Sequence, residues 1–114
     1  MNTKLLLSIR EQIEKSKVKR NKYVIAFDLD ETLWDFVPMD SDEEPKPIWD
    51  NIAVVNELFK DDSLAIVLYT SRRVEDFFET TSLLEKYGVK YHSLQFGKMK
   101  FDVLVDDKSV NPTA

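Results

Sequence analysis

The chain contains no cysteine and a single histidine among its 114 residues. The absence of cysteine excludes disulfides, thiolate catalysis and a cysteine-based zinc site. No apolar run approaches the roughly 18 residues that a membrane-spanning helix needs. Met1 to Ser8 are too weakly apolar for a secretory signal. We therefore expect a cytoplasmic protein that does not contact membranes.

The chain also lacks an excess of positive charge, with 16 lysines and arginines against 21 aspartates and glutamates. The formal net charge is -5 and the pI is about 4.9, a balance that argues against a protein that wraps a nucleic-acid backbone. A short basic cluster, Lys15 to Lys22, is the exception, and its simplest interpretation is a solvated helix end. Steering of a nucleic-acid phosphate by this cluster stays open as an alternative. A Mg²⁺-assisted site for a small anion is compatible with the acidic balance.

Enough apolar sequence is present for one core. Hydrophobic residues make up 43% of the chain, which suits a single packed domain over residues 1–114. Apolar residues at helical spacing predict helices, and continuous apolar runs predict buried strands. Prolines and an acidic block over residues 35–49 predict a loop or flap. The expected helices are residues 3–18, 50–60 and 72–87, the last stopped by Gly88. The expected strands are residues 23–28, 64–69 and 101–105, with a further short strand within residues 89–96.

The expected strands alternate with helices along the chain. This alternation predicts an α/β fold with a mostly parallel sheet of about four strands and right-handed crossovers. An N-terminal helix within residues 1–20 precedes a core, residues 22–111, that holds all of the strands.

Two carboxylates, Asp28 and Asp30, end the first expected strand. A strand buried on both faces has no room for them inside, so they belong at its carboxyl end, where open α/β sheets bind ligands. Neighbouring carboxylates repel, so that one ionises readily while the other keeps a proton longer. The pair suits a nucleophile beside a general acid and base, or two ligands of Mg²⁺. A polar turn after a strand is the simpler alternative.

Polar groups follow the other expected strands as well. Because the carboxyl ends of parallel strands lie along one edge, we expect these groups to share one crevice with the acidic pair. Together they suit phosphoryl transfer, in which Mg²⁺ and cations neutralise an anionic group while hydroxyls and a lysine bind phosphate oxygens. They are Thr70 and Ser71 after the second strand, Lys98 after the third, and Asp106 and Asp107 after the fourth.

These segments, in this order, resemble the motifs of the haloacid dehalogenase-like (HAD) phosphatase superfamily. Asp28-Leu-Asp-Glu-Thr32 is similar to the D-x-D-x-T first motif, and Thr70 is similar to the hydroxyl of the second. Lys98 resembles the lysine of the third motif, with Lys100 as its rival, and the pair Asp106-Asp107 resembles the fourth. The opening is similar to the small magnesium-dependent phosphatases, and the ending is similar to small capless phosphatases of capsule or sugar metabolism.

The resemblance implies a three-layer Rossmann-like fold and Mg²⁺-dependent hydrolysis of a small phosphomonoester. Asp28 would attack phosphorus and become an aspartyl-phosphate, and Asp30 would protonate the leaving oxygen and then activate water. Mg²⁺ would be bound by Asp28, the backbone carbonyl of Asp30 and Asp107, with Asp106 close by. Asn111 stands where the family more often has an acid.

Two departures from the family pattern have consequences. The chain has no room for a cap domain, so we expect an open site that accepts a bulky substrate or is closed by a neighbouring subunit. Eight residues follow Asp106, where the family continues with another helix and strand. The first helix, Leu5 to Ile13, would then cover surface that those elements cover in relatives.

Other interpretations stay open. A phosphoacceptor signalling domain also places carboxylates, a threonine and a lysine around Mg²⁺, but there the lysine comes last, whereas Lys98 precedes Asp106. A non-catalytic binding protein would keep the fold, and a polynucleotide 3′-phosphatase would use the basic cluster. The lone histidine, His92, lies away from the acidic strand ends, and we assign it no role.

Overall fold

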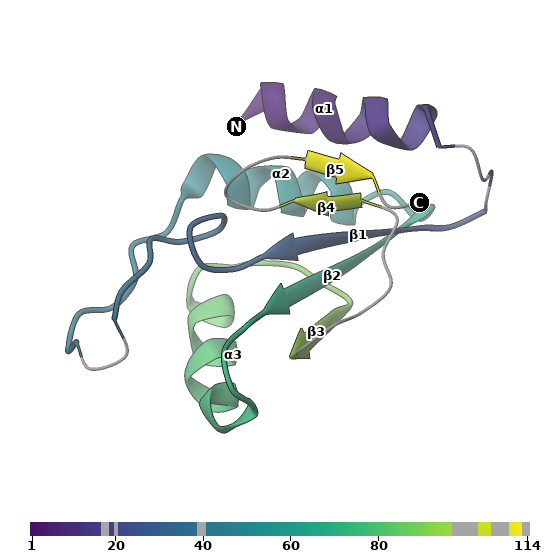
Figure 1. Ribbon diagram of the computed structural model, residues 1–114. Helices are drawn as coiled ribbons and strands as arrows, with labels where there is room; N and C mark the ends of the chain where they lie inside the picture. Colours follow the sequence, from purple (N-terminus) through teal and green to yellow (C-terminus); the bar gives the residue numbers. More distant parts are fainter. Residues whose placement is uncertain (17–18, 20, 39–40, 97–102, 106–109, 113–114) are drawn as a thin grey trace.

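A computed structural model describes residues 1–16, 19, 21–38, 41–96, 103–105 and 110–112 (Figure 1). The helices are α1 (Thr3–Glu14), α2 (Trp49–Phe59) and α3 (Phe77–Lys86), and a short 3-10 helix, η1 (Val74–Asp76), precedes α3. The strands are β1 (Tyr23–Asp28), β2 (Leu64–Thr70), β3 (Ser93–Phe96), β4 (Val103–Val105) and β5 (Val110–Pro112).

The described strands form one sheet in the order β3-β2-β1-β4-β5. All neighbouring pairs are parallel except β4 and β5, which are antiparallel. At the centre, β1 pairs Asp28 with Tyr69 of β2 and Phe27 with Val105 of β4. The predicted α/β class with a mostly parallel sheet is therefore confirmed. The sequence pattern does not predict β5, which adds an antiparallel edge.

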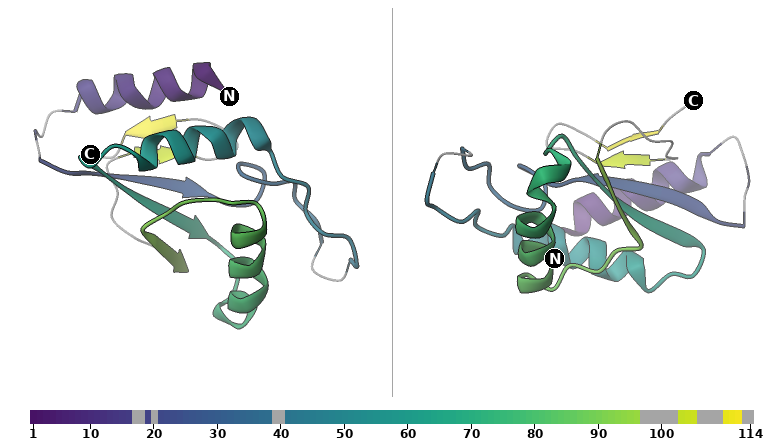
Figure 2. Two further views of the ribbon diagram at one scale, coloured as in Figure 1. Left: turned by 180° about the vertical axis from the view of Figure 1, so that it is seen from behind. Right: turned by 90° about the horizontal axis from the view of Figure 1, so that it is seen from below.

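The described helices lie together on one face of the sheet (Figures 1 and 2). Burial along β2 agrees with this arrangement, because Ile66 and Leu68 are fully buried while the alternate residues Ala65 and Val67 are half-buried. Residues 97–102, which connect β3 to β4, lie outside the described residues. The third layer therefore stays a prediction.

Helix α1 is fastened to the rest of the domain at several points. The Asn2 side chain caps its start by accepting a hydrogen bond from the Leu5 backbone N–H, and Ile9 is fully buried in the core. Arg10 pairs with Asp61 at 2.7 Å. Hydrogen bonds from Ser63, and then from Arg10, lower the pKa of Asp61 to about 2. The helix ends at Glu14, earlier than predicted.

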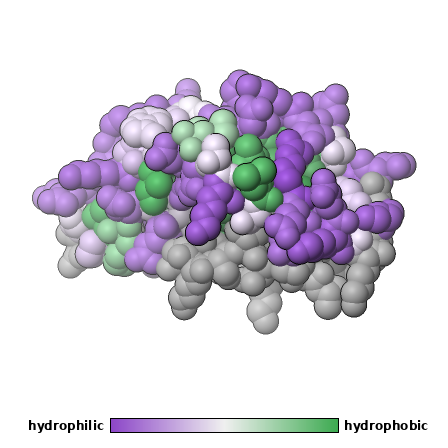
Figure 3. Space-filling view, turned by 90° about the horizontal axis from the view of Figure 1, so that it is seen from above, coloured by the Kyte–Doolittle hydropathy of each residue, from purple (hydrophilic) through white to green (hydrophobic). Residues whose placement is uncertain are grey.

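The outward surface of the α1 side is mostly hydrophilic, with small separate apolar areas (Figure 3). Helix α1 has 12 residues. In the described part of the chain, no helix combines the length and apolar character needed to cross a membrane.

Helix α3 starts later than the sequence pattern predicts. Residues 71–73 follow β2 without helical structure, and α3 itself begins at Phe77. Three residues predicted for its buried face are largely exposed instead, with exposed fractions of 63% for Val74, 45% for Phe77 and 83% for Phe78. That part of the prediction is wrong, because the face that packs on the core is built from Thr80, Leu83, Leu84 and Tyr87. The predicted stop at Gly88 is confirmed by its left-handed backbone, with φ of 65°.

Candidate functional site

The acidic pair is held by a tight turn after β1. Asp28 is the last residue of the strand, and the N–H groups of Thr32 and Leu33 donate to the Leu29 carbonyl at 3.2 and 2.9 Å. Glu31 takes a left-handed backbone with φ of 67°, a conformation that costs free energy in a residue with a side chain. The turn therefore fixes the direction of Asp30 relative to Asp28.

Thr70 lies at the corresponding end of the neighbouring strand. Because Asp28 is paired with Tyr69, the next residue of β2 lies just beyond the end of β1. The sheet thus brings Asp28, Asp30 and Thr70 to one edge, as the sequence predicts. Thr70 is fully buried, and its hydroxyl oxygen accepts a hydrogen bond from the Arg72 backbone N–H at 3.0 Å. This contact fixes the turn after β2, while the predicted contact of Thr70 with phosphate stays a prediction.

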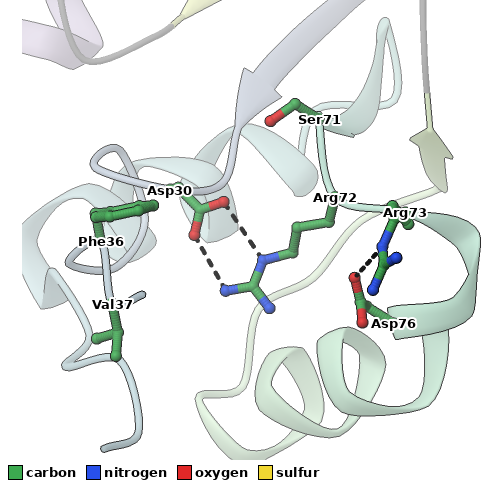
Figure 4. A pocket seen from close by; sticks show the side chains of 7 residues that line it. All are labelled: Asp30, Phe36, Val37, Ser71, Arg72, Arg73 and Asp76. Carbon is green, nitrogen blue, oxygen red and sulfur yellow. Dashed lines mark hydrogen bonds and ion pairs between the residues drawn. The ribbon is translucent and has the colours of Figure 1, made fainter. Parts of the chain in front are cut away.

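Arg72 joins the two strand ends and was not among the predicted site residues. Its guanidinium binds Asp30 through two contacts, from Nη2 to Oδ1 at 3.1 Å and from Nε to Oδ2 at 3.4 Å (Figure 4). The Trp34 indole N–H donates to the same Oδ1 at 2.9 Å. The guanidinium also lies over the Trp34 ring, 5.5 Å from its centre, where the π electrons attract a cation. The side chain of Arg72 is only 8% exposed.

These contacts make the two oxygens of Asp30 different. Oδ1 accepts from both Trp34 and Arg72, whereas among the described residues Oδ2 receives only the longer contact from Arg72. A carboxylate held in this way keeps a fixed direction. Oδ2 is therefore the oxygen better placed to give or take a proton.

A cleft of about 250 Å³ opens beside Asp30 (Figure 4). One wall comes from the segment after the acidic turn and the other from the segment after β2. Ser71 is exposed here, so the structure brings this predicted hydroxyl to the cleft. The lining residues are Asp30, Phe36, Val37, Ser71, Arg72, Arg73 and Asp76.

The segment predicted as a loop or flap contributes to this cleft and is closed at its base. The Asp35 N–H donates to the Lys46 carbonyl at 2.9 Å, and the Ile48 N–H donates to the Leu33 carbonyl at 2.8 Å. We call residues 35–48 the flap. Its base brings the two arms together, so Phe36 and Val37 start from a fixed position.

The returning arm of the flap is anchored on the end of α3. The Tyr87 hydroxyl donates to the carbonyl of the buried Pro45, and Lys86 pairs with Glu44 at 2.6 Å. Burial raises the pKa of Tyr87, and the hydrogen bond with Glu44 raises the pKa of Lys86. Both groups therefore keep their protons at neutral pH, as these contacts require.

Helix α2 supports the acidic turn from behind. The Asn51 side-chain amide donates to the Thr32 carbonyl at 2.9 Å, and its oxygen accepts from the Asn2 side chain at 2.8 Å. These bonds connect the start of α1 to the turn that carries Asp30.

Several predicted site residues fall outside the described part of the chain. They are Lys98, its rival Lys100, and Asp106 and Asp107. Asn111 is described only through its backbone, which pairs with Leu104 between β4 and β5.

Among the described residues, no group of three or more histidine, cysteine, aspartate or glutamate side chains could hold a metal ion. Of the two carboxylates after β1, Asp30 is already bound by Arg72 and Trp34. Mg²⁺ commonly takes only one or two protein carboxylates and completes its shell with water and phosphate oxygens, so binding through Asp28 and the Asp30 carbonyl stays a prediction.

His92 serves the fold. Its ring stacks on Phe59, with centres 4.5 Å apart, and its Nδ1 accepts a hydrogen bond from the Ile66 N–H at 2.9 Å. It lies beside the middle of β2, away from the acidic turn.

Comparisons with known proteins add no assignment. No protein-family model matches the chain, and no curated protein is significantly similar to it in sequence.

Proposed function

We propose that the chain is a Mg²⁺-dependent phosphomonoester hydrolase of the HAD type, with three layers and no cap domain, that acts through an aspartyl-phosphate on Asp28. The observation that carries the proposal is the meeting of Asp28, Asp30 and the β2 end at one edge of the parallel sheet. The acidic turn and the open cleft beside it are consistent with this chemistry.

In the proposed reaction, a carboxylate oxygen of Asp28 attacks phosphorus, and the bond from phosphorus to the ester oxygen breaks. Asp30 Oδ2 gives its proton to that leaving oxygen, so the alcohol departs neutral. Asp30 then takes a proton from water, whose oxygen attacks the phosphoryl group and releases phosphate from Asp28. Mg²⁺, held by Asp28, the Asp30 carbonyl and Asp107 with Asp106 nearby, would supply charge neutralisation.

Arg72 has a positioning role in this proposal. It aims the Asp30 carboxylate through its two contacts with that side chain. Thr70 and Ser71 remain the proposed hydroxyl contacts for the phosphoryl group, and Lys98 remains the proposed cationic contact.

Release of phosphate from a chromogenic ester, with and without Mg²⁺, tests the proposal. We expect Asp28→Asn to abolish turnover, since an amide cannot form the acyl phosphate. Asp62→Asn is a matched control, because Asp62 is exposed and lies in the loop between α2 and β2.

Two results would contradict the proposal. A lasting phosphoryl group on Asp28 without turnover would favour a phosphoacceptor domain, and binding of phosphate esters without release of phosphate would favour a binding protein. A steep salt dependence seen only with a 3′-phosphorylated oligonucleotide would instead point to a polynucleotide substrate.

A further inference from the structure

The cleft lies on the Asp30 side of the proposed reaction centre and not on the Asp28 side. Asp30 lines it, whereas Asp28 is not among its lining residues. In the proposed reaction Asp30 protonates the leaving oxygen, so the atoms attached to that oxygen must continue on the Asp30 side. The cleft is therefore the place for the leaving group.

One wall of this cleft is apolar and exposed. Phe36 is 61% exposed although it belongs to the anchored flap, and Val37 follows it along the same wall. Figure 4 shows the Phe36 ring beside the Asp30 carboxylate. Exposed aromatic rings next to a polar reacting group are well suited to stack on a flat apolar partner.

The charged groups of the cleft are already matched with one another. Asp30 is paired with Arg72 at 3.1 Å, and Arg73 lies 3.8 Å from Asp76 and 3.6 Å from Glu75. Among the described lining residues, each guanidinium therefore has a carboxylate partner. A second anionic group on the substrate would have to displace one of these partners, so an uncharged leaving group fits better.

The size of the cleft limits the leaving group. A closed cavity of about 150 Å³ is enough to hold benzene, and this open cleft measures about 250 Å³. One aromatic ring with a small substituent fits, while a polymer chain would have to extend into solvent.

We infer that the cleft is a leaving-group subsite for uncharged single-ring aryl phosphates, with Phe36 as its stacking residue. The inference rests on the proposed function, and it names the substrate class of the same site. Phe36 acts here as a specificity residue that contacts the ring and takes no part in proton transfer.

The kinetic test compares phenyl phosphate with glycerol 2-phosphate. We expect Phe36→Ala to lower kcat/KM for phenyl phosphate by roughly tenfold, mainly through KM, and to change kcat/KM for glycerol 2-phosphate less than about twofold. Phe36→Tyr should restore the preference, because the ring is kept. Phe78→Ala is the matched control, since Phe78 is 83% exposed and lies outside the cleft lining.

A binding test separates this inference from the proposed function. Phenylphosphonate and methylphosphonate cannot be hydrolysed by attack at an ester, and their affinities in the presence of Mg²⁺ can be measured by calorimetry. We expect Phe36→Ala to weaken phenylphosphonate by roughly tenfold and to leave methylphosphonate unchanged.

If neither ester releases phosphate but phenylphosphonate binding depends on Phe36, the proposed function is wrong and the aryl subsite stands. If both esters are hydrolysed and Phe36→Ala affects them equally or not at all, the subsite is overturned and the hydrolase stands. Equal binding of the two phosphonates to the unmodified protein would also overturn the subsite.

Discussion

At the scale of single residues, the most informative feature is the contact between Arg72 and Asp30. The carboxylate receives a guanidinium from the segment after β2 and an indole N–H from the segment after β1. A planar guanidinium with several donors fixes a carboxylate better than an ammonium group does. If Asp30 is the general acid, the contact with Arg72 assists proton transfer by fixing the direction in which Oδ2 points.

This role of Arg72 predicts a leaving-group dependence. We expect Arg72→Lys to lower kcat about tenfold for glycerol phosphate, whose alkoxide needs protonation, and less than about threefold for p-nitrophenyl phosphate, whose phenolate does not. Both rates are to be measured at saturating substrate.

Arg73→Lys is the control, because the carboxylates that Arg73 contacts are those of Glu75 and Asp76. Equal loss for both esters would mean that Arg72 serves phosphate binding or folding and not the aim of the proton donor.

Residues of this kind are hard to predict from a sequence alone. Arg72 and Asp30 are 42 positions apart, and an arginine after a strand has the same pattern whether it is solvated or buried. Asp28, Asp30, Thr70 and Ser71 were predictable because each follows an apolar run, and strand ends in a parallel sheet share an edge. In the sequence, Arg72 is marked only by its position two residues after Thr70. The register between β1 and β2 is needed to show that Arg72 contacts Asp30.

At the scale of elements, β1 was easier to predict than β5 or the start of α3. The prediction for β1 agrees with its observed bounds, Tyr23–Asp28, because a continuous apolar run in the central strand has one compatible environment. The aromatic pair Phe77 and Phe78 has helical spacing relative to Leu84, so it was assigned to the core. Both rings are exposed instead, because the backbone turns into α3 only at Phe77.

Helix α1 packs against β5, α2 and β4, and Ile9 is its fully buried residue. We expect Ile9→Ala to destabilise the protein by about 2–5 kcal/mol, because Ile9 is fully buried and its truncation leaves a cavity. The free energy of unfolding in urea measures this loss.

Leu7→Ala is the matched control and should cost little, since Leu7 is 67% exposed on the same helix. If Ile9→Ala were as mild as Leu7→Ala, or if removal of residues 1–18 left the free energy of unfolding unchanged, α1 would be an accessory and not part of the core.

At the scale of the whole molecule, stability in acid depends in part on one carboxylate, Asp61, which accepts hydrogen bonds from Ser63 and from Arg10 of a distant segment. The Ser63 and Arg10 hydrogen bonds lower the pKa of Asp61 to about 2, whereas an aspartate in an unfolded chain titrates near 3.9. The folded state therefore favours the ionised carboxylate. Its contribution to stability is complete above about pH 4 and is lost as the pH falls through about 2.

Asp61→Asn should accordingly lower the free energy of unfolding by about 1 kcal/mol at pH 7, a figure reduced for solvent screening of this partly exposed group. The difference between the two proteins should shrink as the pH falls from about 4 to about 2. Denaturant titrations across this range measure it, with Asp62→Asn as control. A difference that persisted unchanged at pH 2 would assign the effect to packing.

The anchoring of the flap affects how changes in sequence could alter which compounds the protein binds. Its arms are joined at Asp35 and Lys46, and the returning arm is fastened to Tyr87. Insertions, deletions or substitutions between Asp35 and Lys46 would change which compounds bind, while the turn that carries Asp28 and Asp30 keeps its position. Under the proposed function, selectivity and chemistry would thus be separable, and libraries randomised in the flap could be screened for activity on new compounds.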